Sequence, residues 1–329
     1  MIRFALSKLA GLLVVMLVVS FVTFAVFYLL PSDPAQMSCG RPCTPENLAI
    51  AREFMGFGKP WYLQYFDFLG GIFGGRTFGT GATAIHCGAP CFGYSFQQNA
   101  PVAELIVDRL PVTFSIAGGA AVAWLLLGVS TGVLSALKRG TLLDRAAMTG
   151  ALAGVSAPTY LVGLLGILLF GFTLDAVPVH GYVPFAESPV DWAWHLVLPW
   201  LVLAFVHAAI YTRLTRGQMI ETLGEDYIRT ARAKGLGERA VVGKHALRNV
   251  LLPVVTLFGI DLGGLLGGAV ITERVFGMPG LGALMMEAVG QLDLPLLLGC
   301  TLFSAFLIVA ANAAVDLLYG FLDPRARLT

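Results

Sequence analysis

The sequence predicts an all-α integral membrane protein with six transmembrane helices and a small outer subdomain after the first helix. Of its 329 residues, 57% are hydrophobic and only 12% are charged. Soluble domains carry about 25% charged residues, so much of this surface must avoid water. Two further observations support this fold class: long apolar stretches recur along the chain, and the basic residues gather between particular stretches.

Six apolar stretches approach the roughly 20 residues that a helix needs to cross a bilayer. Helices are expected because lipid offers the backbone no hydrogen-bond partners. The fourth stretch is the shortest and contains His195, Pro199 and His207. The first follows Arg3 and Lys8 as a signal peptide would, but its apolar core is too long, so we expect a retained helix. The stretches cover residues 9–30, 112–137, 147–174, 195–212, 250–272 and 296–320.

The basic residues orient this topology. Fifteen of the 21 Lys and Arg residues fall in segments that six spans place on one side, namely 1–8, 138–146, 213–249 and 321–329. Basic residues mark the cytoplasmic side. We therefore expect a multi-pass protein of the cell (inner or plasma) membrane with both termini in the cytoplasm. The expected domains are a tail and first helix over 1–30, an outer loop subdomain over 31–110, and a transmembrane core over 111–329 that contains the loop 213–250.

Four cysteines lie in the outer loop, in two similar pieces with three residues between the cysteines. Outer-side thiols meet oxidising conditions, so we expect Cys39, Cys43, Cys87 and Cys91 to form disulfides. Two local bridges and two bridges between the pieces are both compatible with the sequence. A four-thiolate zinc site is the weaker alternative, because its usual spacing has two residues between the cysteines, and no metal site is predicted. Cys300 is expected to be a small buried residue in the sixth span.

The longest basic segment, residues 213–250, is a candidate contact for a separate motor. Tyr227–Lys234 has helical composition, and Gly235-Leu236-Gly237 then breaks the helix before Glu238 starts another. Ala231 and Gly235 are one turn apart, which predicts a small-residue face that lets a partner approach. The simpler alternative is that the segment only anchors the topology through its positive charge. A DNA-binding helix-turn-helix is discounted because membrane spans flank the segment. The candidate coupling residues are Tyr227, Arg229, Ala231, Arg232, Lys234, Gly235, Leu236 and Gly237.

No phosphate loop of the form Gly-x-x-x-x-Gly-Lys-Ser/Thr occurs in the sequence, so we expect no ATP hydrolysis by this chain. Among polar residues in the spans, Asp261 lies midway along the fifth. An intramembrane carboxylate either lines the transport path, where it would meet a substrate ammonium group, or forms a hydrogen bond between helices. Asn312 and Asp316, one turn apart in the sixth span, are expected to serve packing. The sparse polar groups make a proton relay an unconvincing alternative.

Several motifs in order resemble the ABC importer permeases of the dipeptide/oligopeptide/nickel family. The most specific is Thr230-Ala-Arg-Ala-Lys-Gly235, with Leu252-Pro253 downstream. The resemblance covers nearly the whole chain, and the long outer loop is similar to the first of the two permease types in such systems. The other matching segments are Leu30–Ala35, Gly58–Pro60 with Gln64-Tyr65, Arg109–Thr113, Glu273–Gly282, Asp316–Tyr319 and Leu322–Arg325.

The resemblance implies a permease for peptides, with nickel or another small solute as the alternative. It implies four kinds of partner: a second permease, two cytoplasmic ATPases that bind ATP and Mg, an outer substrate-binding protein and membrane lipid. No cofactor is then expected on this chain, and nucleic acid is not a partner. The segment around 227–237 would be the coupling helix, and residues 273–282 would contribute to an outer gate through Glu273, Phe276, Pro279 and Gly280. The two cysteine pieces depart from the family pattern.

Overall fold

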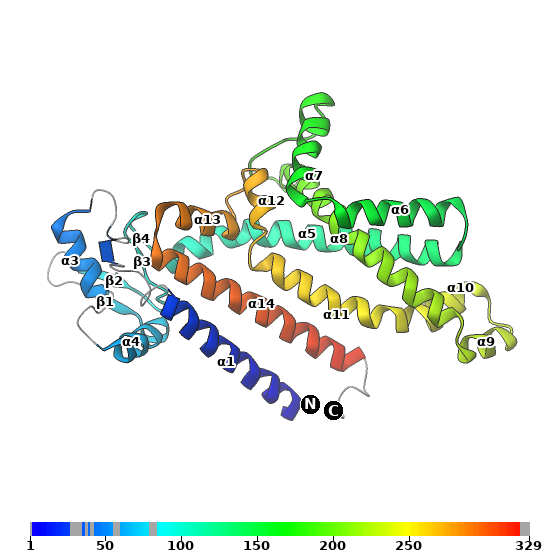
Figure 1. Cartoon of the computed structure of the whole chain (residues 1–329), viewed down its shortest axis with the longest axis horizontal. Coiled ribbons are helices and arrows are strands. Elements are labelled where there is room, and N and C mark those ends of the chain that lie inside the picture. The colour runs from blue at the N-terminus through cyan, green and yellow to red at the C-terminus, as the bar shows by residue number, and fades with distance from the viewer. Residues whose placement is uncertain are drawn as a thin grey trace.

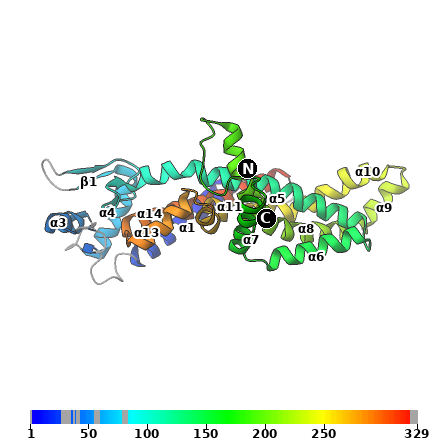
Figure 2. The ribbon, with the colours of Figure 1, turned by 90° about the horizontal axis from the view of Figure 1, so that it is seen from above.

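The computed structural model describes residues 2–26, 35–36, 39, 43–54, 60–78 and 84–322. Long helices run side by side, with the outer subdomain at one end and α9 and α10 at the other (Figures 1 and 2). Three of the family-like segments lie mostly outside the described residues, which leave out residues 30–34, 58–59 and 323–325. The helices outside the outer subdomain include α1 (Ile2–Phe24), α5 (Val102–Leu137), α6 (Leu142–Ser156), α7 (Thr159–Gly166), η3 (Ile167–Thr173), α8 (Pro189–Leu223), α9 (Asp226–Ala233), α10 (Glu238–Ala240), η4 (Val241–Ala246), α11 (Leu247–Leu266) and α14 (Leu294–Leu322).

Within the described residues, four helices are long and apolar enough to cross a membrane. The number is five if the bent pair of helices over 142–173 is counted as one span. The four are α5, α8, α14 and the helix that runs from Glu238 to Leu266. The shorter apolar helix Ala10–Phe24 belongs to the predicted first span. Helices therefore form at all six predicted stretches, while the number six itself stays a prediction. The helix α5 begins at Val102 rather than near residue 112, and α8 continues to Leu223 rather than ending near 212.

The third predicted stretch, 147–174, is not one straight helix. Its two halves, α6 and α7 with η3, meet at an angle of 106°. The break falls at Ala157-Pro158, where Ala157 has an extended backbone. Proline lacks the backbone N–H that a continuing helix requires, and its ring disfavours the helical conformation of the residue before it. In the predicted fifth stretch, α11 ends at Leu266, and residues 270–272 belong to the separate helix α12 (Val270–Val275).

Close packing of α5 on α8 depends on glycine. A Cβ atom added to Gly128 would lie 2.5 Å from the Tyr211 Cβ, and one added to Gly132 would lie 2.6 Å from the Thr215 Cβ. These two glycines are four residues apart and lie on one face of α5. Small residues at this spacing allow the backbones of membrane helices to come close together. Gly119 likewise packs against Trp200, whereas its neighbour Gly118 meets open space.

The outer subdomain combines short helices and strands with two disulfides. The cysteines pair locally, Cys39 with Cys43 and Cys87 with Cys91, which is one of the two pairings that the sequence left open. Three of these cysteines are buried in a small cluster with Phe96. The strands pair as antiparallel β1–β2 and β3–β4. The elements are α3 (Pro45–Phe54), α4 (Trp61–Gly74), β1 (Arg76–Phe78), β2 (Ile85–Cys87), β3 (Tyr94–Ser95) and β4 (Ala100–Pro101).

Candidate coupling surface and transport path

The helix α9 forms where the sequence predicted it. It covers Asp226–Ala233, and Gly235 follows with a left-handed φ of 79° that favours glycine over residues with a side chain. The next helix starts at Glu238, as expected. Figure 1 places α9 at the end of the molecule opposite the outer subdomain, beyond the ends of the long helices. The predicted helix, Tyr227–Lys234, therefore agrees with the observed one within one residue at each end.

One face of α9 packs inward. Ile228 and Ala231 are buried with Met219, Val241 and Val250 in a cluster that joins α9 to α8, η4 and α11. The prediction that Ala231 shares an exposed small-residue face with Gly235 is therefore wrong for Ala231, which is only 7% exposed. Its small side chain brings α9 close to its own protein. By contrast, a Cβ atom added to Gly235 would meet open space.

The other face of α9 is exposed and carries two arginines, Arg229 and Arg232, with Asp226 at the start of the helix. Arg232 makes a bidentate ion pair with Glu238. Its Nη2 donates to Oε1 of Glu238 at 2.6 Å, and its Nε donates to Oε2 at 3.1 Å. This pair braces α9 against α10, so Arg232 has an internal partner besides any external one. Tyr227 accepts a hydrogen bond at 2.7 Å from Asn249 of α11. The predicted coupling residues that are exposed are Tyr227, Arg229, Arg232, Lys234, Gly235, Leu236 and Gly237.

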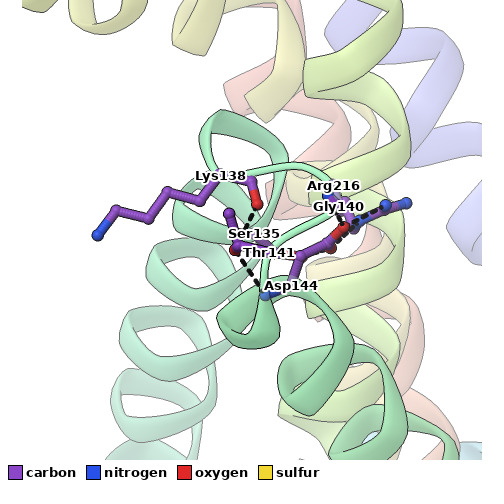
Figure 3. Close-up of polar contacts among 6 residues, drawn as sticks. All are labelled: Ser135, Lys138, Gly140, Thr141, Asp144 and Arg216. Carbon is purple, nitrogen blue, oxygen red and sulfur yellow. Dashed lines mark hydrogen bonds and ion pairs between the residues drawn. The ribbon is translucent and has the colours of Figure 1, made fainter.

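The end of α8 that leads to α9 is fixed by a buried charge cluster around Asp144 (Figure 3). The Arg216 guanidinium donates to both carboxylate oxygens, from Nε at 2.7 Å and from Nη2 at 3.0 Å. Ser135 of α5 donates at 2.5 Å, and the Gly140 backbone N–H donates at 2.8 Å. One carboxylate therefore ties α5, the 138–141 loop and α6 to α8. A hydrogen-bonded pair of this kind holds its elements in one geometry.

Asp261 makes the hydrogen bond between helices that was one of its two predicted roles. Its Oδ2 accepts from the Tyr211 hydroxyl of α8 at 2.8 Å, and His207 Nδ1 lies 3.8 Å from the same oxygen. The Trp124 ring stacks on His207 with ring centroids 4.7 Å apart. Asp261 keeps part of its side chain exposed. A role in the path, the other alternative, stays a prediction.

A groove runs along α11 between the level of Asp261 and the segment that carries α9. Its volume is about 630 Å³, and it is lined mostly by residues of α11, with Leu214 from α8. Two of its lining residues, Leu257 and Ile260, are one turn and one residue before Asp261 in the chain. The groove therefore extends from the level of Asp261 to Asn249, next to the coupling segment.

The predicted outer segment forms a packed turn between α12 and α13 (Leu281–Gln291). Glu273 is fully buried, and its carboxylate accepts hydrogen bonds from Thr113 Oγ1 and the Ala283 N–H, both at 2.8 Å. Burial raises the pKa of the Glu273 carboxyl despite these donors. Thr113 also accepts from the Leu281 N–H at 2.8 Å, so α5 and the segment are joined twice.

The remaining residues of this segment differ in their exposure. Phe276 is buried in the main core with Met278, whereas Pro279 is exposed. Gly280 packs so closely on Glu273 that a side chain at this position would overlap the carboxylate. This arrangement joins the outer segment firmly to α5. A role in gating is not tested by the geometry and stays a prediction.

Two family descriptions match almost the entire chain. The inner membrane component of binding-protein-dependent transport systems matches residues 128–328, and the N-terminal part of such membrane components matches residues 1–117. The chain belongs to this family. The resemblance to ABC importer permeases that the motifs indicated is thereby confirmed, and the permease is an integral component of the inner membrane.

Relatives of this permease are similar over their full length. It is 39% identical over 322 residues to a putative peptide transport system permease protein of Brucella abortus, with 98% of both chains covered. It is 34% identical over 351 residues to the dipeptide transport system permease protein of Escherichia coli, with 99% of both covered. It is 36% identical over 348 residues to the di/tripeptide transport system permease protein of Pseudomonas aeruginosa, again with 99% of both covered.

A solved structure confirms the fold of the permease. A methionine ABC transporter in inward-facing conformations has a TM-score of 0.51 and 17% identity, and it covers 67% of this chain and 97% of its own. The likeness extends over two thirds of this chain and nearly all of that one. At this low identity the likeness concerns the fold alone.

Sequence reasoning missed the residues that hold the candidate surfaces in place. Asp144 and Arg216 are 72 positions apart, and Thr113 and Glu273 are 160 apart, so neither pair shows as a motif. One local signal was present for Asp144. It lies three residues after Thr141, whose hydroxyl caps α6 by accepting from the Asp144 N–H. An acidic residue in the first turn suits a helix N-terminus, which also gives a reason for Asp144 without any partner.

Proposed function

We propose that this permease forms one half of the translocation path of an ATP-driven importer of peptides. The observation that carries the proposal is α9, a helix with two exposed arginines that is held by the packing of its buried face at one end of the membrane helices. The names of the relatives, which are peptide and dipeptide permeases, support the substrate class. Nickel or another small solute is the second candidate substrate, because the resembling family covers both.

The proposed assembly contains a second permease, two cytoplasmic ATPases and an outer binding protein. ATP and Mg bind to the ATPases, and this chain contributes no catalytic residue and no cofactor. Both termini lie in the cytoplasm, on the side of α9. The exposed cations Arg229 and Lys234 meet acidic groups of one ATPase, while Arg232 stays paired with Glu238. Arg229 also lies 3.5 Å from Asp226 in an exposed pair, which a partner can replace.

The packing of α9 on its neighbours explains how ATP hydrolysis on the partner subunits would be coupled to movement of the membrane helices. Closure of the ATPases moves α9, and the buried contacts of Ile228 and Ala231 carry this motion to α8 and α11. The Asp144–Arg216 pair makes the α5–α6 hairpin move with α8. The spans then rock from inward-open to outward-open, and the segment 273–282 helps to form the outer gate. Asp261, beside the groove, meets the ammonium group of a peptide during passage.

Gly235→Arg tests the coupling assignment. A side chain there enters open space, so membrane insertion should persist, but it would block close approach of an ATPase. Gly181→Arg is the matched control, because Gly181 also has a positive φ (91°) and open space around it but lies in the opposite, outer part of the chain. We expect the Gly235 variant alone to lose co-purification of the ATPases and substrate-stimulated hydrolysis. Normal ATPase coupling in that variant would refute the assignment.

Uptake measurements distinguish the candidate substrates. Cells that express the complete system are given labelled dipeptides, labelled oligopeptides or nickel in parallel. Peptide uptake that stops when the ATPases are inactivated supports the proposal. Uptake of nickel alone would favour the second candidate. Transport that continues without the ATPases would indicate a motor-independent carrier or channel instead.

A further inference from the structure

The helix α4 of the outer subdomain rests directly on two membrane helices. Phe68 of α4 is buried with Phe24 of α1 and with Leu298 and Leu302 of α14. The Tyr65 hydroxyl lies 2.8 Å from the Ser20 hydroxyl and donates to the Leu17 carbonyl oxygen at 3.3 Å. Figure 1 shows α4 beside the ends of α1 and α14 that lie toward the outer subdomain. These contacts fix α4 at the level of the outer half of α1.

A second side of α4 carries an exposed aromatic stripe. Tyr62, Phe66 and Phe73 are spaced by four and seven residues, so they project from one side of the helix. Phe66 is 65% exposed and Phe73 is 84% exposed. The two polar side chains in the middle of the helix, Gln64 and Asp67, point to a different side by the same helical spacing. A contiguous apolar surface of this kind marks a contact with a membrane or a protein.

This stripe continues the surface of α1 that faces lipid. Trp61, which is 50% exposed, packs against Phe21 of α1 with ring centroids 6.3 Å apart. Phe21 stays 42% exposed beside Trp61, in line with other large apolar residues of α1 that are about half exposed. Within a bilayer such a surface is covered by lipid wherever no other chain packs on it, and the contact with Phe21 places Trp61 at the same level of the membrane. The exposed residues of α1 are Leu13, Val14, Val15, Leu17, Val18, Phe21 and Val22.

We propose that α4 lies in the outer leaflet of the bilayer, with Trp61, Tyr62, Phe66 and Phe73 inserted among the lipids, and thereby fixes the outer subdomain to the membrane. Tryptophan and tyrosine concentrate at membrane interfaces because their rings are apolar and their edges are polar. An amphipathic helix can lie in this plane with its apolar face buried in the headgroup and acyl boundary. Lipid is favoured over a soluble partner because the stripe is continuous with the lipid-facing surface of α1.

Fluorescence quenching tests this placement in the full chain. The protein is reconstituted into vesicles of phosphatidylcholine with or without bromine on the upper acyl chain, which quenches nearby tryptophan. Phe66→Trp adds a reporter to the stripe. Ala49→Trp, at an exposed position of α3 in the same subdomain, is the matched control. A third variant, Trp61→Phe, removes a native reporter with little change in shape and measures the contribution of Trp61 by difference.

The proposal makes a definite prediction for each variant. The emission added by Phe66→Trp should be mostly lost in brominated vesicles, and that added by Ala49→Trp should be retained. The wild-type chain should lose more emission to bromine than Trp61→Phe does. Unquenched emission at both positions 61 and 66 would overturn the proposal. So would emission at position 66 that bromine leaves unchanged but an added outer binding protein shifts, because the stripe would then be a protein-docking surface.

Discussion

Replacing Glu273 with alanine is expected to loosen the outer end of the permease. The fully buried carboxylate accepts from Thr113 of α5 and from the Ala283 backbone, each at 2.8 Å. Alanine leaves both buried donors without an acceptor, at about 1–3 kcal/mol each, so the free energy of unfolding should fall by about 2–6 kcal/mol. Glu273→Gln keeps an acceptor oxygen and nearly the same volume, so it should cost clearly less.

A thiol-reactive dye can follow this loss during heating in detergent. Cys300 is the one cysteine outside the two disulfides, and it is buried with Leu281 and Leu284, next to the segment that Glu273 holds. The dye therefore reports the opening of this part of the protein. Glu287→Ala is the control, because Glu287 is exposed on α13 and its loss should change stability by no more than about 0.5 kcal/mol. Equal unfolding midpoints for Glu273→Ala, Glu287→Ala and the wild type would refute the reasoning.

Three further predictions concern other parts of the structure. Asp144→Ala should free the 138–141 loop, seen as faster trypsin cleavage after Lys138, and an unchanged rate would show that the Arg216 pair does not hold the loop. Gly132→Val should cost about 1–3 kcal/mol by pushing α5 away from α8, whereas the same change at Gly118, which meets open space, should not. Burial raises the pKa of the Asp293 carboxyl, so the folded protein keeps this proton to a higher pH than the unfolded chain does. The free energy of unfolding should therefore fall as the pH rises from the ordinary aspartate pKa of about 3.9 through the raised pKa of the folded state. The dye midpoint of Asp293→Asn should depend less on pH; an identical slope would contradict this.

The contact of Asp293 explains why the last prediction concerns the whole outer end. Asp293 caps α14 by accepting from the Leu296 N–H at 3.2 Å, and it also accepts from the Ser95 hydroxyl of β3. One buried carboxyl therefore connects the outer subdomain to a membrane helix. Asparagine retains an acceptor for the cap, so Asp293→Asn tests the titration without removing the connection.

The coupling segment shows which features of the structure could be predicted from the local sequence. Helical composition and two glycines located α9 and its break, because helix formation and a left-handed cap depend on neighbours within a few residues. Which face of α9 is exposed could not be read the same way. Ala231 packs inward because Val241 and Met219, from η4 and α8, occupy that side.

The break in the third span has a local signal, Ala157-Pro158, that the hydropathy pattern alone does not reveal. Ala157-Pro158 is visible in the sequence, but apolar residues continue on both sides of it, so length and hydrophobicity alone indicated one helix. The angle of 106° is a tertiary outcome, because proline permits a kink without fixing its size.

Composition, periodicity and the order of motifs along the chain were enough to predict the membrane class, the approximate positions of the helices, the break after α9 and the family. Only the tertiary structure decided which distant residues meet. It chose local disulfides, joined Asp144 to Arg216 and Glu273 to Thr113, and laid α4 on α1. The physical reason is that a buried polar group needs a partner, and the partner is whichever side chain the packing brings within hydrogen-bond distance.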